Sequence, residues 1–293
     1  MKIFLIFKID QFFPPNHAPS IVDLLPISST IMHLYHEVHE GNGPYMLMVH
    51  GMLSSRAQWM LNVDALKEVC CPVVVELWGH ARSSAPNDPS HYRPKYYLEQ
   101  FEVLRQKIGA EQWLLCGQSM GAGLTWNYAL EFPKRIFAHI FTNSASAFAD
   151  GKTVKRFVDR AGPTADLVDE AGAEGLLKIP VHPIHARYMP DDAKAAMVED
   201  SKLHTPEGII QAFFETSPNV SVRHRVGENR IPTLLFCGSK EDRFKVPRDW
   251  AAKNVPNLTI VDAPVGHASN VQAADSFNEA VKEFVSNHGG LWR

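Results

Sequence analysis

Cysteine is scarce in this chain of 293 residues, and its placement does not suggest a disulfide framework. Of the four cysteines, Cys70 and Cys71 are adjacent, while Cys116 and Cys237 end apolar runs that are typical of buried strands. We interpret Cys116 as strand filler, because no cationic group or helix N-terminus is evident that would activate its thiol. Reduced thiols and a cytoplasmic location are therefore expected.

The chain also lacks a block of charge of one sign. Its 29 basic and 32 acidic residues give a formal net charge of -3 and are spread without long runs. The sequence therefore has no cluster of basic residues that could bind nucleic acid or an anionic membrane surface. We therefore expect a small-molecule substrate, and the oligomeric state stays open.

The N-terminal apolar run is too short to form a transmembrane segment. It covers residues 3–7 and is interrupted by Lys8 and Asp10 before any small-residue cleavage site. We interpret residues 1–18 as an N-terminal extension, with a peripheral membrane contact as the alternative.

No complete phosphate-binding loop of the G-x-G-x-x-G or G-x-x-x-x-G-K-[S/T] type occurs in the sequence. His182 and His185 lie close together, but no cysteine or carboxylate accompanies them at the spacing of metal ligands. The sequence therefore predicts no cofactor and no metal.

Strand-like and helix-like segments alternate from residue 31 onward, which favours an α/β fold with a parallel sheet and helices on both faces. Residues 31–40 and 45–51 are both strand-like, and the glycines and proline of residues 41–44 predict a hairpin between them. Further strands are expected over residues 72–80, 113–117, 135–145, 231–238 and 258–264, and helices near residues 56–69, 96–108, 120–132, 248–254 and 271–285.

Residues 149–226 interrupt this alternation with helical patterns such as PDDAKAAMVED and without a convincing buried strand. We therefore predict an α/β core formed by residues 19–148 and 227–293, with an all-helical insertion between its two parts.

A serine lies between two glycines where the apolar run WLLC ends, in the order Gly117, Gln118, Ser119, Met120, Gly121. A G-x-S-x-G sequence can occur by chance, but it is also typical of a nucleophile elbow, a strand-to-helix turn so tight that its neighbours have no room for a side chain. The serine hydroxyl then projects above the sheet. Ser119 is the candidate nucleophile.

A serine nucleophile needs a base and an orienting carboxylate, in the chain order serine, acid, histidine. Glu241 and Asp242 follow one apolar strand, and His267 follows the next. Because the carboxyl ends of parallel strands meet at one edge of a sheet, we expect these side chains to approach Ser119.

An oxyanion hole needs two backbone N–H donors, one after the nucleophile and one from an early strand-to-helix loop. Met120 supplies the first, and Met52, after the strand that ends at His50 and Gly51, is assigned the second. The two methionine side chains are expected to line a pocket, and His50 and His80 to make structural hydrogen bonds near the site.

Five ordered motifs, HGMLSS, ELWGHARSS, GQSMG, GSKEDRFKVP and GHASN, resemble those of the α/β-hydrolase fold superfamily over residues 31–148 and 227–287. The resemblance implies a mostly parallel sheet of eight strands, a helical cap inserted after the sixth strand, and a triad of Ser119, an acid after the seventh strand, and His267. The usual G-H-G motif ends here in Ala81. Counting three residues from Gly238 gives Glu241, whereas the phrase DRFKVP favours Asp242, which is the predicted acid.

A serine at the elbow distinguishes this chain from family members with an aspartate nucleophile and favours hydrolysis of a carboxylic ester, lactone or thioester. Candidate pocket residues are His50, Leu53, Phe148, Met189, Phe213 and Phe214. One alternative is carbon–carbon chemistry on the same triad, by a diketone hydrolase or a lyase of the menaquinone-pathway type. Diketone hydrolases often carry a tryptophan after the histidine, where Ala268 stands here. Another alternative is a receptor of the same fold with slow turnover.

Overall fold

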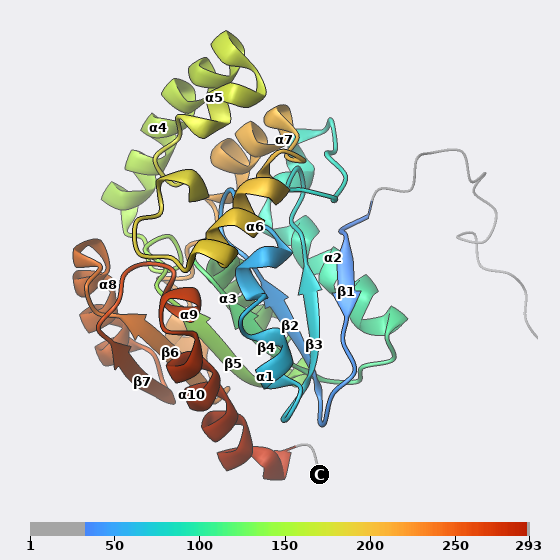
Figure 1. The fold of residues 1–293 in the computed structure, drawn as a ribbon. Coiled ribbons are helices and arrows are strands. Elements are labelled where there is room, and N and C mark those ends of the chain that lie inside the picture. The colour runs from blue at the N-terminus through green and yellow to red at the C-terminus, as the bar shows by residue number, and fades with distance from the viewer. Residues whose placement is uncertain (1–32, 292–293) are drawn as a thin grey trace, which may run out of the picture. The chain divides into compact units, whose positions relative to one another are not determined.

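A mixed sheet of seven strands runs through the part of the chain that the computed structural model describes, residues 33–291 (Figure 1). The strands are β1 (His36–Val38), β2 (Tyr45–Val49), β3 (Cys71–Val75), β4 (Trp113–Gly117), β5 (Ile136–Thr142), β6 (Thr233–Gly238) and β7 (Leu258–Ala263). Their order in the sheet is β1-β3-β2-β4-β5-β6-β7, and only β1 is antiparallel to its neighbour. This confirms the α/β class, with seven described strands where eight were expected. The predicted extension, residues 1–18, lies outside the described residues.

The central strands are buried on both faces, as their continuous apolar sequences require. In β2, Leu47 and Val49 pack into the cluster on one face, while Met46 and Met48 pack into the cluster on the other. This alternation is the two-residue period of a strand. The sheet thus has two apolar faces for helices to cover.

The predicted hairpin between β1 and β2 is wrong. β1 pairs with β3 instead, with His36 opposite Val75, and β3 separates it from β2. Gly41 and Gly43 serve a different purpose, since a Cβ atom on either would collide with backbone atoms of residues 67–70. These glycines let the connection pass close beside residues 67–70, which lead into β3, so β2 can enter the middle of the sheet.

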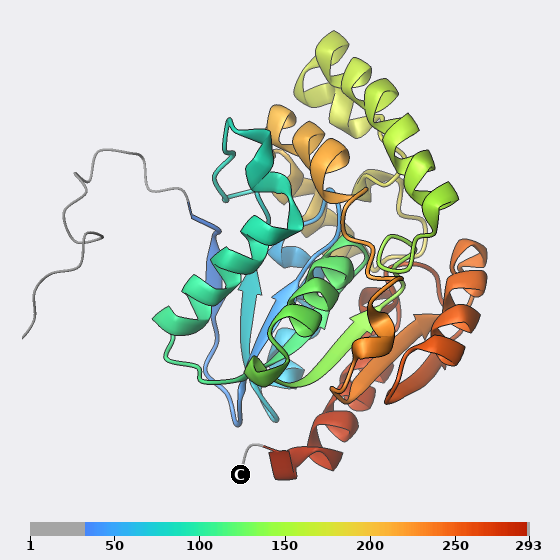
Figure 2. The ribbon, with the colours of Figure 1, turned by 180° about the vertical axis from the view of Figure 1, so that it is seen from behind.

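Helices cover both faces of the sheet (Figures 1 and 2). On one face lie α1 (Val63–Leu66), α9 (Ser269–Gln272) and α10 (Ala274–Asn287); on the other lie α2 (Pro94–Lys107), α3 (Met120–Glu131) and α8 (Asp242–Asn254). The helix expected near residues 56–69 is shorter, because a 3-10 turn (Arg56–Trp59) precedes the single turn of α1. The last helix begins later than expected and follows α9.

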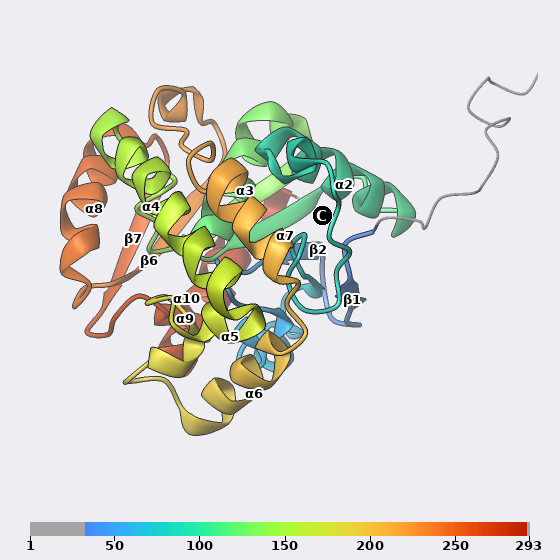
Figure 3. The same ribbon diagram turned by 90° about the horizontal axis from the view of Figure 1, so that it is seen from above.

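Between β5 and β6 the chain forms helices, with no strand in residues 143–232. They are α4 (Gly151–Ala171), α5 (Ala173–Leu177), α6 (Asp191–Ser201), α7 (Pro206–Gln211) and a π-helical turn (Ala212–Thr216). We call residues 149–226 the helical segment. Seen from above, it lies over the carboxyl edge of the sheet (Figure 3).

An ionic network joins the helical segment to the sheet. The guanidinium of Arg82 contacts the Asp200 carboxylate of α6 at 2.5 Å and the Glu76 carboxylate at 2.8 Å. Ser55 donates a hydrogen bond of 2.7 Å to the same Asp200 carboxylate. Because Glu76 is fully buried, its charge needs these partners. α6 is therefore tied to the loops at the carboxyl edge.

Candidate active site

Ser119 occupies the sharp turn between β4 and α3. Its backbone has φ 52° and ψ -116°, which is a strained conformation for a residue with a side chain. A Cβ atom on Gly117 would collide with Thr125 and Ala122, and one on Gly121 with the carbonyls of Val49 and His50. This explains the two glycines: each lies where another segment passes too close for a side chain.

The loop of residues 50–55 lies directly beside the serine. A Cβ atom on Gly51 would stand 2.9 Å from the Ser119 Cβ and would also collide with the side chain of Gln118. Met52 follows Gly51, and Met120 opens α3 directly after the serine. Close packing at Gly51 thus brings the two chain segments that carry the predicted oxyanion donors together.

His267 and Glu241 come from neighbouring loops at the same edge. The His267 Nδ1 lies 2.9 Å from the Glu241 Oε2. A Cβ atom on Gly238 would collide with the carbonyl of Gly266, so these two loops approach closely after β6 and β7. Burial raises the pKa of Glu241, but the hydrogen bonds from His267 and Asn143 outweigh burial and leave the pKa below its usual range.

The structure does not place Asp242, the acid predicted from the sequence, beside His267. Its carboxylate is 85% exposed and pairs with the ammonium of Lys245 at 2.7 Å. The reason is local: α8 begins at Asp242, so its side chain points along the first helical turn toward the residue three positions on. Glu241, at the N-cap in extended conformation, points toward His267 instead.

Asn143, which the sequence reasoning missed, holds Glu241 from the loop that directly follows β5. Its Nδ2 donates to the Glu241 Oε2 at 2.8 Å and to the Gly238 carbonyl at 2.9 Å, while its Oδ1 accepts from the Gly238 amide at 2.8 Å. Next to it, the hydroxyl of Ser144 donates to the carbonyl of Ser119 at 2.6 Å. The signal available in the sequence was the polar pair that follows the apolar strand β5 at the edge of the site.

His50 and His80 make structural hydrogen bonds around the 50–55 loop. The Nε2 of His50 accepts from the Leu77 amide at 3.0 Å, so its Nδ1 carries the proton and donates to the Gly51 carbonyl at 2.7 Å. Burial lowers the pKa of His50 to about 3 and holds the pKa of His80 well below its usual range. Both rings therefore remain neutral supports of the loop at neutral pH.

The other predicted pocket residues lie in several places. Leu53 and Phe213 share one apolar cluster, in which the 50–55 loop meets the helical segment. Met189 packs in a second cluster with Met197, and Phe214 is 42% exposed. Phe148 is buried in the aromatic core beside Trp126, with ring centroids 5.9 Å apart.

Metal-ligand clusters of three or more His, Cys, Asp or Glu are absent from residues 33–291. His182 is buried, and its Nδ1 accepts from the amide of Ile184 at 3.2 Å, whereas His185 contacts the carbonyl of Leu177. Burial raises the pKa of the Cys116 thiol well above its usual range, which leaves it unreactive. Within the same part of the chain, no helix has the length and apolar character needed to cross a membrane.

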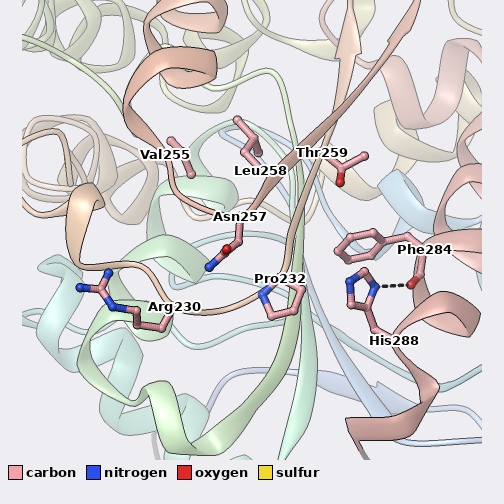
Figure 4. A pocket seen from close by; sticks show the side chains of 8 residues that line it. All are labelled: Arg230, Pro232, Val255, Asn257, Leu258, Thr259, Phe284 and His288. Atoms are coloured by element: carbon pink, nitrogen blue, oxygen red, sulfur yellow. Dashed lines mark hydrogen bonds between the residues drawn. The ribbon is translucent and has the colours of Figure 1, made fainter.

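A pocket of about 600 Å³ opens at the opposite edge of the sheet (Figure 4). It is lined by Arg230, Pro232, Val255, Asn257, Leu258, Thr259, Phe284 and His288. Since β6 and β7 begin there and end beside Glu241 and His267, this pocket is separate from the candidate active site.

The chain belongs to the α/β-hydrolase fold family, because a sequence model of that family matches residues 44–274. It is similar to a putative 2-succinyl-6-hydroxy-2,4-cyclohexadiene-1-carboxylate synthase of Bacillus subtilis, with 21% identity over 83% of this chain and 90% of the relative. Carboxylesterase YbfK of the same organism is 22% identical over 85% of this chain and 82% of its own length. Among solved structures, an enol-lactonase from Burkholderia xenovorans superposes with a TM-score of 0.71 at 19% identity, covering 86% of this chain and 96% of the lactonase.

Proposed function

We propose that this protein is a serine hydrolase that cleaves a small to medium carboxylic ester, lactone or thioester through a triad of Ser119, His267 and Glu241. The observation that carries the proposal is the strained elbow at Ser119, on the sheet edge where Glu241 holds His267 through a hydrogen bond of 2.9 Å. A residue kept in such a conformation indicates a functional constraint.

In this mechanism the Nε2 of His267 removes the Ser119 proton while Oγ attacks the substrate carbonyl carbon. Glu241 accepts the hydrogen bond of Nδ1–H, which fixes the tautomer that leaves Nε2 free as a base, and its charge stabilises the imidazolium that forms. The amides of Met52 and Met120 bind the oxyanion. When the tetrahedral intermediate collapses, the bond between the carbonyl carbon and the leaving-group oxygen breaks. The leaving alkoxide takes the proton from His267. Water then repeats the sequence on the acyl-enzyme.

The substrate side is formed by the 50–55 loop and the helical segment. Leu53 and Phe213 meet there with Val168 and Ile209, which favours a compact and partly apolar acyl group. The similarity to a carboxylesterase and to an enol-lactonase supports the same class of substrate.

The test is hydrolysis of p-nitrophenyl esters from acetyl to dodecanoyl by the native protein, by Ser119→Ala and by Ser286→Ala. Ser286 is exposed on α10 and serves as the matched control. The proposal predicts turnover that collapses in Ser119→Ala alone, with a chain-length optimum set by the apolar cluster. Equal activity in all three proteins would refute it.

An elimination by the same triad is the second candidate, since the Bacillus subtilis synthase matches over most of both chains. There Ser119 would act as a base rather than as a nucleophile, and no acyl-enzyme would form. Trapping the reaction with acid and measuring the mass of the protein separates the two, because an acyl adduct on Ser119 forms only in hydrolysis.

A further inference from the structure

His204 joins the helical segment to the loop that follows β3. It lies between α6 and α7 and is only 5% exposed. Its Nδ1 accepts a hydrogen bond of 2.9 Å from the amide of Ala81, and the amide of the next residue, Thr205, donates to the carbonyl of Gly79 at 2.9 Å. Two adjacent residues of the helical segment are thus attached to the backbone of residues 79–81.

The same loop supports the 50–55 loop through His80. The Nε2 of His80 accepts from the amide of Leu53 at 3.2 Å, and its Nδ1 donates to the carbonyl of Trp78 at 2.9 Å. The rings of His80 and His204 meet edge to face, with centroids 5.3 Å apart. Imidazole rings therefore connect the helical segment to Leu53, the residue after Met52.

His204 acts on Ala81 directly and on Leu53 through the ring of His80. Because its Nδ1 is an acceptor, the neutral ring carries its proton on Nε2. This Nε2 has no hydrogen-bond partner within residues 33–291. Burial lowers the pKa of His204 to about 4, so the ring is neutral at neutral pH and its Nδ1 stays an acceptor.

Leu53 needs such support because its backbone is left-handed, with φ 56°, although it is not a glycine. Ala81, whose amide His204 holds, is left-handed too, with φ 42°, at the position where the family motif has glycine. The amide of each strained residue donates a hydrogen bond to a histidine, that of Ala81 to His204 and that of Leu53 to His80. Without these contacts the loop would relax, and the Met52 amide, one residue away, would move.

We propose that His204 is a positioning residue that couples the helical segment to the oxyanion hole. It holds the Ala81 amide directly and, through the ring of His80, supports the Leu53 backbone conformation that aims the Met52 amide at the substrate. The inference rests on the proposed function, because it assigns that amide to the oxyanion.

The experiment compares His204→Leu, His204→Asn and the control Glu215→Gln. Leucine removes the hydrogen bond to the Ala81 amide and the edge-to-face contact with His80, whereas the Oδ1 of asparagine can still accept from the Ala81 amide. Glu215→Gln breaks another link between the helical segment and the core, the ion pair of Glu215 with Arg93 at 2.8 Å. Steady-state kinetics on the best p-nitrophenyl ester, and inhibition by a boronic acid that forms a tetrahedral adduct with serine, are measured for each.

His204→Leu is expected to lower kcat by about 10- to 100-fold, less than the loss of a whole oxyanion donor, while KM changes by less than about threefold. Binding of the boronic acid should weaken in parallel with kcat. His204→Asn should recover part of the loss, and Glu215→Gln should match the native protein. A rise in KM with unchanged kcat, or equal losses in His204→Leu and Glu215→Gln, would overturn the proposal.

Hydrogen exchange of the peptide that covers residues 51–55 gives a readout without turnover. In folded His204→Leu, exchange of the Leu53 amide should be faster than in the native protein and in Glu215→Gln. Unchanged exchange would overturn the coupling by itself. If instead Ser119→Ala hydrolyses esters as well as the native protein, the proposed function fails while the exchange result still decides the role of His204.

Discussion

Replacing Glu241 by glutamine, with Asp242→Asn as the matched control, separates the two neighbouring acids. Glutamine keeps the size of the side chain but loses the charge, and its amide can present an N–H to the Nδ1 of His267. The ring is then held in the wrong tautomer, with its proton on Nε2, where it cannot accept the serine proton. Asp242→Asn removes a charge that is 85% exposed and bound to Lys245.

The size of the effect follows from the geometry of the pair. Two unit charges about 4 Å apart attract each other by about 4 kcal/mol at an effective dielectric constant near 20. The His267 ring is 46% exposed and Glu241 18% exposed, so water screens part of this attraction. Because the proposed mechanism forms the imidazolium along the reaction path, the remaining attraction of about 2–3 kcal/mol acts on the rate and corresponds to about 30- to 150-fold in kcat.

The assay is the pre-steady-state burst of p-nitrophenol, which isolates acylation. Glu241→Gln should slow the burst by about 30-fold or more, whereas Asp242→Asn should stay within about twofold of the native protein. A large loss in Asp242→Asn together with a small loss in Glu241→Gln would refute the assignment of the acid.

Three further outcomes follow from the same contacts. Ser119→Gly should be more stable than Ser119→Ala to urea by about 1 kcal/mol, since glycine relieves the strain at φ 52° but costs chain entropy; equal stability would contradict the strained elbow. Asn143→Ala should slow ester hydrolysis by about tenfold and lower the free energy of unfolding by about 2 kcal/mol, because Glu241 and a buried amide lose a partner; a native-like rate would show that the carboxylate needs no such anchor. Burial lowers the pKa of His50 and of His139 to about 3 in the folded protein. At a pH below the ordinary histidine pKa, the unfolded chain therefore binds more protons than the folded protein. Unfolding free energy should therefore fall as pH drops, by about 2 kcal/mol for each histidine between pH 6.5 and 5, and a flat urea profile over this range would contradict their neutral burial.

The sequence predicted the elements whose signals are local and strong. The central strands are continuous apolar runs. Glycine is found on each side of Ser119 because a side chain at either position would collide with a neighbouring segment. The α/β class and the family followed from the order of the motifs, and both are confirmed.

What the sequence could not supply depends on tertiary contacts. Whether Glu241 or Asp242 faces His267 depends on where α8 begins, a difference of one residue. The place of β1 depends on backbone packing at Gly41 and Gly43. In the sequence, these glycines look the same as those of a hairpin turn. Asn143 belongs to a short polar pair after a strand, and its role becomes visible only when β6 lies beside it.

Covalent labelling tests most directly whether Ser119 is an activated nucleophile. The protein would be treated with a fluorophosphonate, and the modified residue located by mass spectrometry after trypsin digestion. We expect one adduct, on Ser119, which is lost in Ser119→Ala and strongly slowed in His267→Ala. No adduct on Ser119 in a protein that turns over esters, or an adduct that persists in Ser119→Ala, would contradict it.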